Sequence, residues 1–107
     1  MINRNMRLIV FFDLPVTGKA DRRAYSAFRH FLIKDGYDML QYSVYGRITL
    51  NHDDAAAHIR RLKQHLPPRG SVRVMQVTEK QYRSIEILVG EKTASEDFLV
   101  PEELLEI

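Results

Sequence analysis

Near its N-terminus the chain reads Arg7-Leu-Ile-Val-Phe-Phe-Asp-Leu-Pro15. The large apolar residues of this run follow one another without alternation, which is typical of a strand buried on both faces. We therefore predict a strand over residues 6–12, followed by a loop that Pro15 and Gly18 impose. The strand anchors the core, and the elements predicted after it are arranged around it.

Two helices are predicted by apolar residues that recur at spacings of three and four. The first helix begins near Asp21 and is capped by Gly36. The second begins at the N-cap Asn51 and runs to Leu66, where two prolines stop it. The faces expected in the core consist of Ala24, Tyr25, Phe28, Phe31 and Leu32 in the first helix, and of Ala55, Ile59, Leu62 and Leu66 in the second.

The remaining apolar stretches predict further strands. Residues 37–50 are too long for one ordinary strand and predict two, broken near Ser43 or Gly46. Residues 72–78 predict a fourth strand and residues 85–89 a short fifth one. The order indicates an α+β, ferredoxin-like βαββαβ fold, an antiparallel sheet with two helices on one face, plus a C-terminal extension.

Length and charge distribution set the organisation of the chain. Its 107 residues form one small domain, for which dimerisation is expected because little surface is buried in a monomer. The net charge is only +2, but residues 91–107 hold six acidic residues and one lysine, which leaves 15 basic and 8 acidic residues in the first ninety. We expect a domain at 1–90 that suits a polyanionic partner, and a tail at 91–107 that docks on a partner or dimer mate.

Composition also excludes several classes of protein. The chain contains no cysteine, which removes disulfides, thiolate metal sites and cysteine nucleophiles. There is no signal-peptide pattern and no apolar stretch of about 20 residues, so a cytoplasmic protein is expected. The spacings of His30, His52, His58 and His65 fit no metal-ligand motif, and we interpret the pair on the second helix, His58 and His65, as surface residues.

Asp13 is the best catalytic candidate in the sequence. An ionised carboxylate beside a long apolar run needs water, a donor or a cation to replace its lost solvation. The alternative is structural, because an aspartate before a turn often accepts a hydrogen bond from its own following backbone. Position alone leaves both interpretations open, with the structural one favoured.

Basic residues form two candidate nucleic-acid surfaces on the predicted helices. An ordinary solvated helix face is the alternative for each of them. The aromatic residues Tyr25, Phe28, Tyr42 and Tyr45 are expected in the core or a dimer interface, not as base-stacking platforms. The two basic surfaces consist of Lys19, Arg22, Arg23 and Arg29, and of Arg60, Arg61 and Lys63.

Three sequence words, in this order and separation, resemble the second CRISPR-associated (Cas) protein family. They are Leu8-Ile-Val-Phe-Phe-Asp13-Leu-Pro, Leu40-Gln-Tyr-Ser-Val-Tyr45 and Gly70-Ser-Val-Arg-Val74. The resemblance covers residues 7 to about 92, and the words Thr78-Glu-Lys-Gln-Tyr82 and Ile87-Leu-Val-Gly-Glu91 are similar to the subgroup that accompanies type II systems.

The resemblance implies a small Mg²⁺-dependent nuclease that dimerises through its sheets and serves in spacer acquisition with the family's integrase. Only Asp13 carries over as a catalytic and metal-binding position. Many relatives place a second acidic residue within a few positions, whereas the next acid here is Asp21. A homodimer could supply the second carboxylate, because Mg²⁺ is commonly held by one or two carboxylates together with waters and phosphates.

Several functional hypotheses follow. The first is a homodimeric subunit of a CRISPR adaptation complex that binds duplex DNA and bridges the CRISPR-associated integrase. The second is a Mg²⁺-dependent endonuclease that acts through Asp13 on RNA or DNA, with single-stranded RNA among its substrates. The alternatives are a toxin-type ribonuclease of related fold and a ferredoxin-like regulatory module, for which no ligand-specific residues are found.

Overall fold

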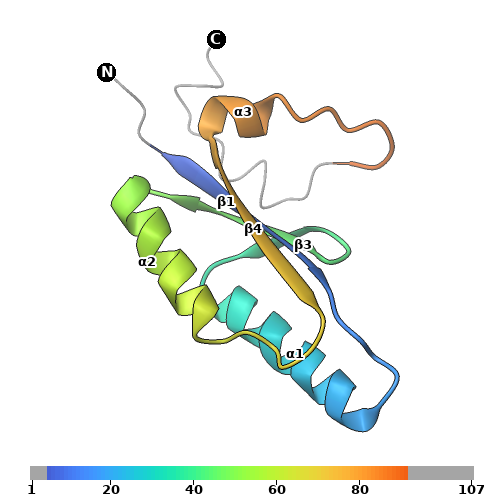
Figure 1. Ribbon diagram of the computed structural model, residues 1–107. Coiled ribbons are helices and arrows are strands. Elements are labelled where there is room, and N and C mark those ends of the chain that lie inside the picture. The colour runs from blue at the N-terminus through green and yellow to red at the C-terminus, as the bar shows by residue number, and fades with distance from the viewer. Residues whose placement is uncertain (1–4, 92–107) are drawn as a thin grey trace.

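The computed structural model describes residues 5–91 of the chain. A four-stranded antiparallel sheet has the strand order β2-β3-β1-β4, as a ferredoxin-like arrangement requires (Figure 1). The predicted fold class is therefore confirmed. In chain order the elements are β1 (Met6–Asp13), α1 (Lys19–Lys34), β2 (Asp38–Gln41), β3 (Val44–Thr49), α2 (His52–Lys63), β4 (Ser71–Thr78) and α3 (Glu79–Arg83).

Strand β1 is central and has two chemically different faces. Leu8, Val10 and Phe12 pack into one hydrophobic core with residues from both long helices. Successive side chains of a strand point to opposite faces, so the other residues of β1 belong to the face that α1 and α2 leave uncovered. We call this the open face; it carries Arg7, Ile9, Phe11 and Asp13 of β1.

The predicted helix α2 is confirmed at its start and is shorter than predicted at its end. The Asn51 side chain caps the helix by accepting a hydrogen bond from the Asp54 amide at 2.9 Å. The last helical residue is Lys63, so Leu66 lies beyond the helix and is exposed. The buried residues of α2 are Ala55, Leu62 and His58, and His58 is only 6% exposed.

The break between the two middle strands lies at Tyr42 and Ser43, and Gly46 is inside β3. Ser43 has a φ of 65°, in the left-handed region that non-glycine residues rarely adopt. Its carbonyl accepts a hydrogen bond from the Phe12 amide at 3.1 Å. This bond holds the turn beside the end of β1, one residue from Asp13.

The fifth strand predicted at residues 85–89 is wrong. Thr78 ends β4 and starts α3 through a capping box with Gln81, and residues 84–91 form no strand in the described part of the chain. A strand needs a neighbour to satisfy its backbone groups, and no strand within residues 5–91 pairs with this segment. The tail predicted at 91–107 lies, apart from its first residue, outside the described residues.

No helix in the described part of the chain is long and apolar enough to cross a membrane.

Candidate functional site at the end of strand β1

Asp13 is the last residue of β1 and lies exposed on the open face. Ser71, the first residue of β4, is its partner across the antiparallel pair. No side-chain hydrogen bond or ion pair among residues 5–91 uses the Asp13 carboxylate. The turn-capping interpretation of Asp13 therefore finds no support in the structure, and its oxygens remain available for a cation or a substrate.

The backbone around Asp13 is closely packed against the loop that precedes β4. Gly70 has a φ of +101°, and a Cβ added there would lie 2.7 Å from the Asp13 carbonyl oxygen. Such a contact is shorter than van der Waals packing permits, so only glycine fits this position. Gly70 thus lets β4 begin directly beside Asp13, and this close packing fixes the position of the Asp13 backbone.

Asp21, the next acidic residue in the sequence, does not join Asp13. Its carboxylate accepts hydrogen bonds from Arg69 at 3.1 Å and, at the limit of 3.5 Å, from the Thr17 hydroxyl. Among the described residues no group of three or more His, Cys, Asp or Glu side chains could hold a metal ion. The end of β1 thus carries the Asp13 carboxylate without a second acidic residue from this segment of the chain.

A group of tyrosines lies on the other side of the strand end. Tyr45 accepts a hydrogen bond from Arg29 Nε at 2.8 Å. Burial raises the pKa of Tyr25, and a hydrogen bond with Tyr42 raises that pKa further. Phe28 and Tyr45 are buried as predicted, whereas Tyr42 is 78% exposed and belongs to no core.

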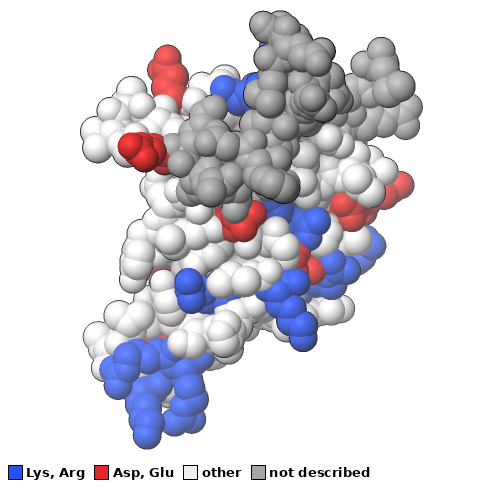
Figure 2. Space-filling model, turned by 180° about the vertical axis from the view of Figure 1, so that it is seen from behind, with Lys and Arg blue, Asp and Glu red and all other residues white. Residues whose placement is uncertain are grey.

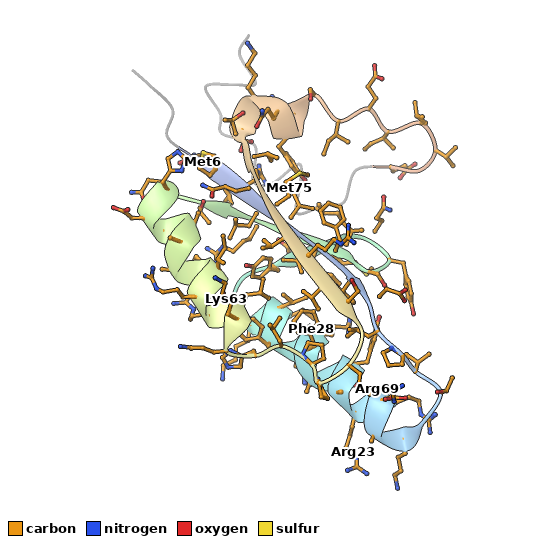
Figure 3. The ribbon with its side chains drawn as sticks, viewed as in Figure 1. Met6, Arg23, Phe28, Lys63, Arg69 and Met75 are labelled. Atoms are coloured by element: carbon orange, nitrogen blue, oxygen red, sulfur yellow. The ribbon has the colours of Figure 1, made fainter. Side chains whose placement is uncertain are left out.

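The first predicted basic surface is partly a structural network. Lys19 and Arg23 are exposed at the start of α1, where Lys and Arg side chains gather at the lower end of the molecule (Figure 2). Arg22 donates to the Thr17 carbonyl at 3.1 Å and so also holds the loop before α1. Arg69, which the sequence interpretation missed, lies at the same end as Arg23 (Figure 3). Arg69 is far in sequence from the other basic residues of this surface, so sequence patterns did not group it with them, although it directly precedes the Gly70-Ser-Val-Arg word.

The second basic surface contains one residue that is already paired. Arg60 and Lys63 are exposed, but Arg61 forms an ion pair with Asp35 at 2.7 Å. The same carboxylate accepts a hydrogen bond from His58 Nδ1 at 2.8 Å, so the interpretation of His58 as a surface residue is wrong. Burial alone would raise the pKa of Asp35, yet the hydrogen bonds and charges of His58 and Arg61 hold it below its usual value.

Comparisons with known proteins identify the family. The family model described as CRISPR associated protein Cas2 matches residues 6–85, which span the sheet, both long helices and Asp13. The chain belongs to the Cas2 family. The match includes all three sequence words on which the resemblance was based.

Two relatives and one solved structure illustrate the similarity. The chain is 62% identical over 85 residues to a CRISPR-associated endoribonuclease Cas2 of Acidovorax ebreus, covering 79% of this chain and 83% of that protein. It is 48% identical over 86 residues to the protein of the same name from Treponema denticola, covering 80% and 85%. A crystal structure of a Cas2 protein, 20% identical, covers 84% of this chain and 92% of its own with a TM-score of 0.50, which supports the fold of this Cas2-family chain.

Proposed function

We propose that this chain is a homodimeric, Mg²⁺-dependent endonuclease in which Asp13 is the catalytic carboxylate. The observation that carries the proposal is the position of Asp13, exposed and without a partner among residues 5–91, at the end of a buried strand. The relatives described above are named endoribonucleases, and this name favours RNA as the first substrate to test. The family match favours this function over the toxin-type ribonuclease and the regulatory module.

The open face supports a homodimer. Phe11, Met75 and Ile87 on or over this face are 36%, 48% and 43% exposed, which is unusual for large apolar residues of a sheet. They line a groove of about 460 Å³ between the sheet and the segment after α3. A second copy that packs on this face about a two-fold axis would bury the groove and bring both Asp13 side chains to one cleft, since Asp13 lies on the same face.

The paired carboxylates would hold Mg²⁺ together with waters and a phosphate oxygen of the substrate. Mg²⁺ supplies charge stabilisation at the scissile phosphate and lowers the pKa of a bound water. The role of this chain is to place one carboxylate oxygen of each subunit toward that site. The close packing of Gly70 against the Asp13 carbonyl and the hydrogen bond from the Phe12 amide to the Ser43 carbonyl keep the end of β1 in place.

Asp13→Asn tests the nuclease, with Asp53→Asn as the matched control. Asp53 is an exposed acidic residue in the first turn of α2, and α2 follows the end of β3 that pairs with Met6, at the opposite end of β1. We expect Asp13→Asn to lose Mg²⁺-dependent cleavage of single-stranded RNA and of DNA by at least about 100-fold, and Asp53→Asn to keep it. Unchanged cleavage by Asp13→Asn would refute the proposed catalytic role.

A second function, binding duplex DNA in spacer acquisition and bridging the integrase, is favoured by the basic surface at the start of α1. Exposed cations on one surface bind phosphates without base contacts, and the logarithm of the affinity falls by about 0.9 per contact for each logarithmic unit of salt. We expect Lys19→Glu with Arg23→Glu to weaken duplex binding and reduce the salt slope by about 2. Arg60→Glu with Lys63→Glu tests the second surface in the same assay.

Co-purification with the integrase and spacer integration in cells separate the two functions. If Asp13→Asn abolishes cleavage while integration persists, DNA bridging is the primary role of the subunit. If the chain binds neither the integrase nor duplex DNA, the adaptation function is refuted while the nuclease stands.

A further inference from the structure

A hollow of about 460 Å³ lies beside the Tyr42–Ser43 turn, between α1 and the edge of the sheet. Its walls combine aromatic rings with a cation. The residues that matter for its chemistry are Tyr25, Arg29, Met39, Tyr42 and Tyr45. Cavities of this size with a few convergent polar groups are typical of small-ligand and nucleotide sites.

Tyr42 presents an exposed ring at the mouth of this hollow. It is 78% exposed, whereas Tyr37 and Tyr45 are each only 2% exposed. The next residue, Ser43, is held with a φ of 65° by the hydrogen bond from the Phe12 amide. Backbone strain of this kind tends to occur at functional sites, where surrounding contacts must hold it. The turn therefore maintains the ring in an exposed position at an energetic cost.

Arg29 contributes a positioned cation to the same hollow. Its Nε donates to the hydroxyl of Tyr45 at 2.8 Å, and Tyr45 is only 2% exposed, so the guanidinium is anchored by a buried group. Within residues 5–91 Arg29 forms no ion pair with an acidic side chain. Its charge and remaining N–H donors are therefore available to an anion, in a fork that suits phosphate oxygens.

We propose that this hollow binds one unpaired nucleotide, whose base stacks on Tyr42 and whose phosphate is held by Arg29. An exposed aromatic ring stacks on any base, but only where the base is not already covered by neighbours on both sides, as it is in a duplex. Ser43, the residue after Tyr42, accepts a hydrogen bond from the amide of Phe12, which is the residue before Asp13. The inference deepens the proposed nuclease function and rests on it, because it places an unpaired nucleotide of the substrate beside the strand end that carries Asp13.

Binding of single strands in EDTA tests the site without cleavage. Fluorescence anisotropy with a labelled 12-nucleotide single-stranded RNA would be compared with a duplex of the same sequence. We expect Tyr42→Ala to weaken single-strand binding about 5- to 100-fold, the range found for removal of one stacking aromatic, and to leave duplex binding within about twofold. Tyr42→Phe keeps the stacking ring and should bind within about twofold of the original chain.

Two further variants control for charge and for exposed apolar surface. Arg29→Gln should weaken single-strand binding and reduce its salt slope by about 0.7. Leu50→Ala removes another exposed apolar side chain, at the opposite end of β3, and should leave binding unchanged. Unfolding curves of Tyr42→Ala that match those of the original chain show that a loss of binding is local.

The outcomes separate this inference from the nuclease proposal. Unchanged single-strand binding by Tyr42→Ala, or an equal loss for duplex and single strand, refutes the nucleotide site whatever Asp13→Asn does. If Tyr42→Ala instead converts a dimer to a monomer in sedimentation, the hollow is a self-association surface and the inference is also overturned. If Tyr42→Ala weakens binding as expected but Asp13→Asn still cleaves, the nucleotide site stands and the Asp13 mechanism fails.

Discussion

Arg7 of β1 and Glu79 of α3 form a bidentate ion pair on the open face, with Nε–Oε2 and Nη2–Oε1 distances of 2.8 and 2.9 Å. The two side chains are only 4% and 5% exposed, and the guanidinium lies over the Tyr82 ring at 4.3 Å from its centroid. A buried charge depends on its partner for solvation. This pair therefore fixes α3 against the sheet.

Removing one partner of this pair should destabilise the protein strongly. We expect Glu79→Ala to lower the free energy of unfolding by about 3–5 kcal/mol, because it leaves the Arg7 charge buried and unpaired. Urea unfolding measures the change, and Glu86→Ala, an exposed residue after α3, serves as the control with a change below about 0.5 kcal/mol. A loss below about 1 kcal/mol for Glu79→Ala would mean that the charge of Arg7 is solvated in another way.

Gly70→Ala should disturb the end of β1. The substitution meets an unfavourable φ of +101° and a Cβ contact of 2.7 Å with the Asp13 carbonyl. Gly90→Ala is the matched control, because Gly90 has a φ of +105° but no atom within 4 Å of an added Cβ. We expect Gly90→Ala to cost at most about 1–2 kcal/mol of unfolding free energy, from backbone strain alone, and Gly70→Ala to cost more and to reduce cleavage. Equal costs would show that the contact at Asp13 relaxes freely.

Local sequence patterns predicted most of the fold. Strands and helices that pack on one core have apolar residues at regular spacings, and these spacings can be recognised in the sequence. The long apolar run located β1 and therefore Asp13, and the N-cap Asn51 located the start of α2. The prediction of a fifth strand was wrong because the alternation of Ile85, Ile87 and Val89 indicates that one face of the segment is apolar. It does not indicate whether another strand is available to pair with the segment. Here these residues line a groove over the sheet.

Contacts between residues that are far apart in the chain could not be predicted from the sequence. His58 reads as a surface histidine, and only the fold brings it to Asp35, 23 positions earlier. The contact between Asp21 and Arg69 likewise joins residues 48 positions apart. Tyr42 was expected in the core or in a dimer interface, but it lies in the turn between β2 and β3 and outside the core of the chain.

Two buried tyrosines should respond in opposite directions to loss of their hydroxyl. Burial raises the pKa of Tyr37 to about 12, and its buried hydroxyl has no hydrogen-bond partner in the described part of the chain. We expect Tyr37→Phe to leave stability unchanged or raise it by up to about 1 kcal/mol, because an unsatisfied polar group is removed. Tyr45→Phe loses the bond from Arg29 and should cost about 1 kcal/mol. Chemical unfolding of both variants checks this, and a marked loss for Tyr37→Phe would reveal a partner for its hydroxyl.

The ion pairs of Asp35 should make stability depend on pH in the acid range. Its pKa in the folded chain lies below the usual value, as described above, so its contribution is fully present above the unfolded pKa of about 3.9 and is lost as the pH falls through the folded pKa. Asp35→Asn carries no charge at any pH. We therefore expect the variant to be less stable than the original chain at pH 6, and the difference in unfolding free energy to shrink as the pH falls below about 3.9 and through the lowered pKa of Asp35, where Asp35 itself becomes neutral. Asp38→Asn is the control, since Asp38 takes part in no ion pair among residues 5–91. A stability difference that stays constant from pH 6 to pH 2 would show that Asp35 acts through packing and not through the charges of His58 and Arg61.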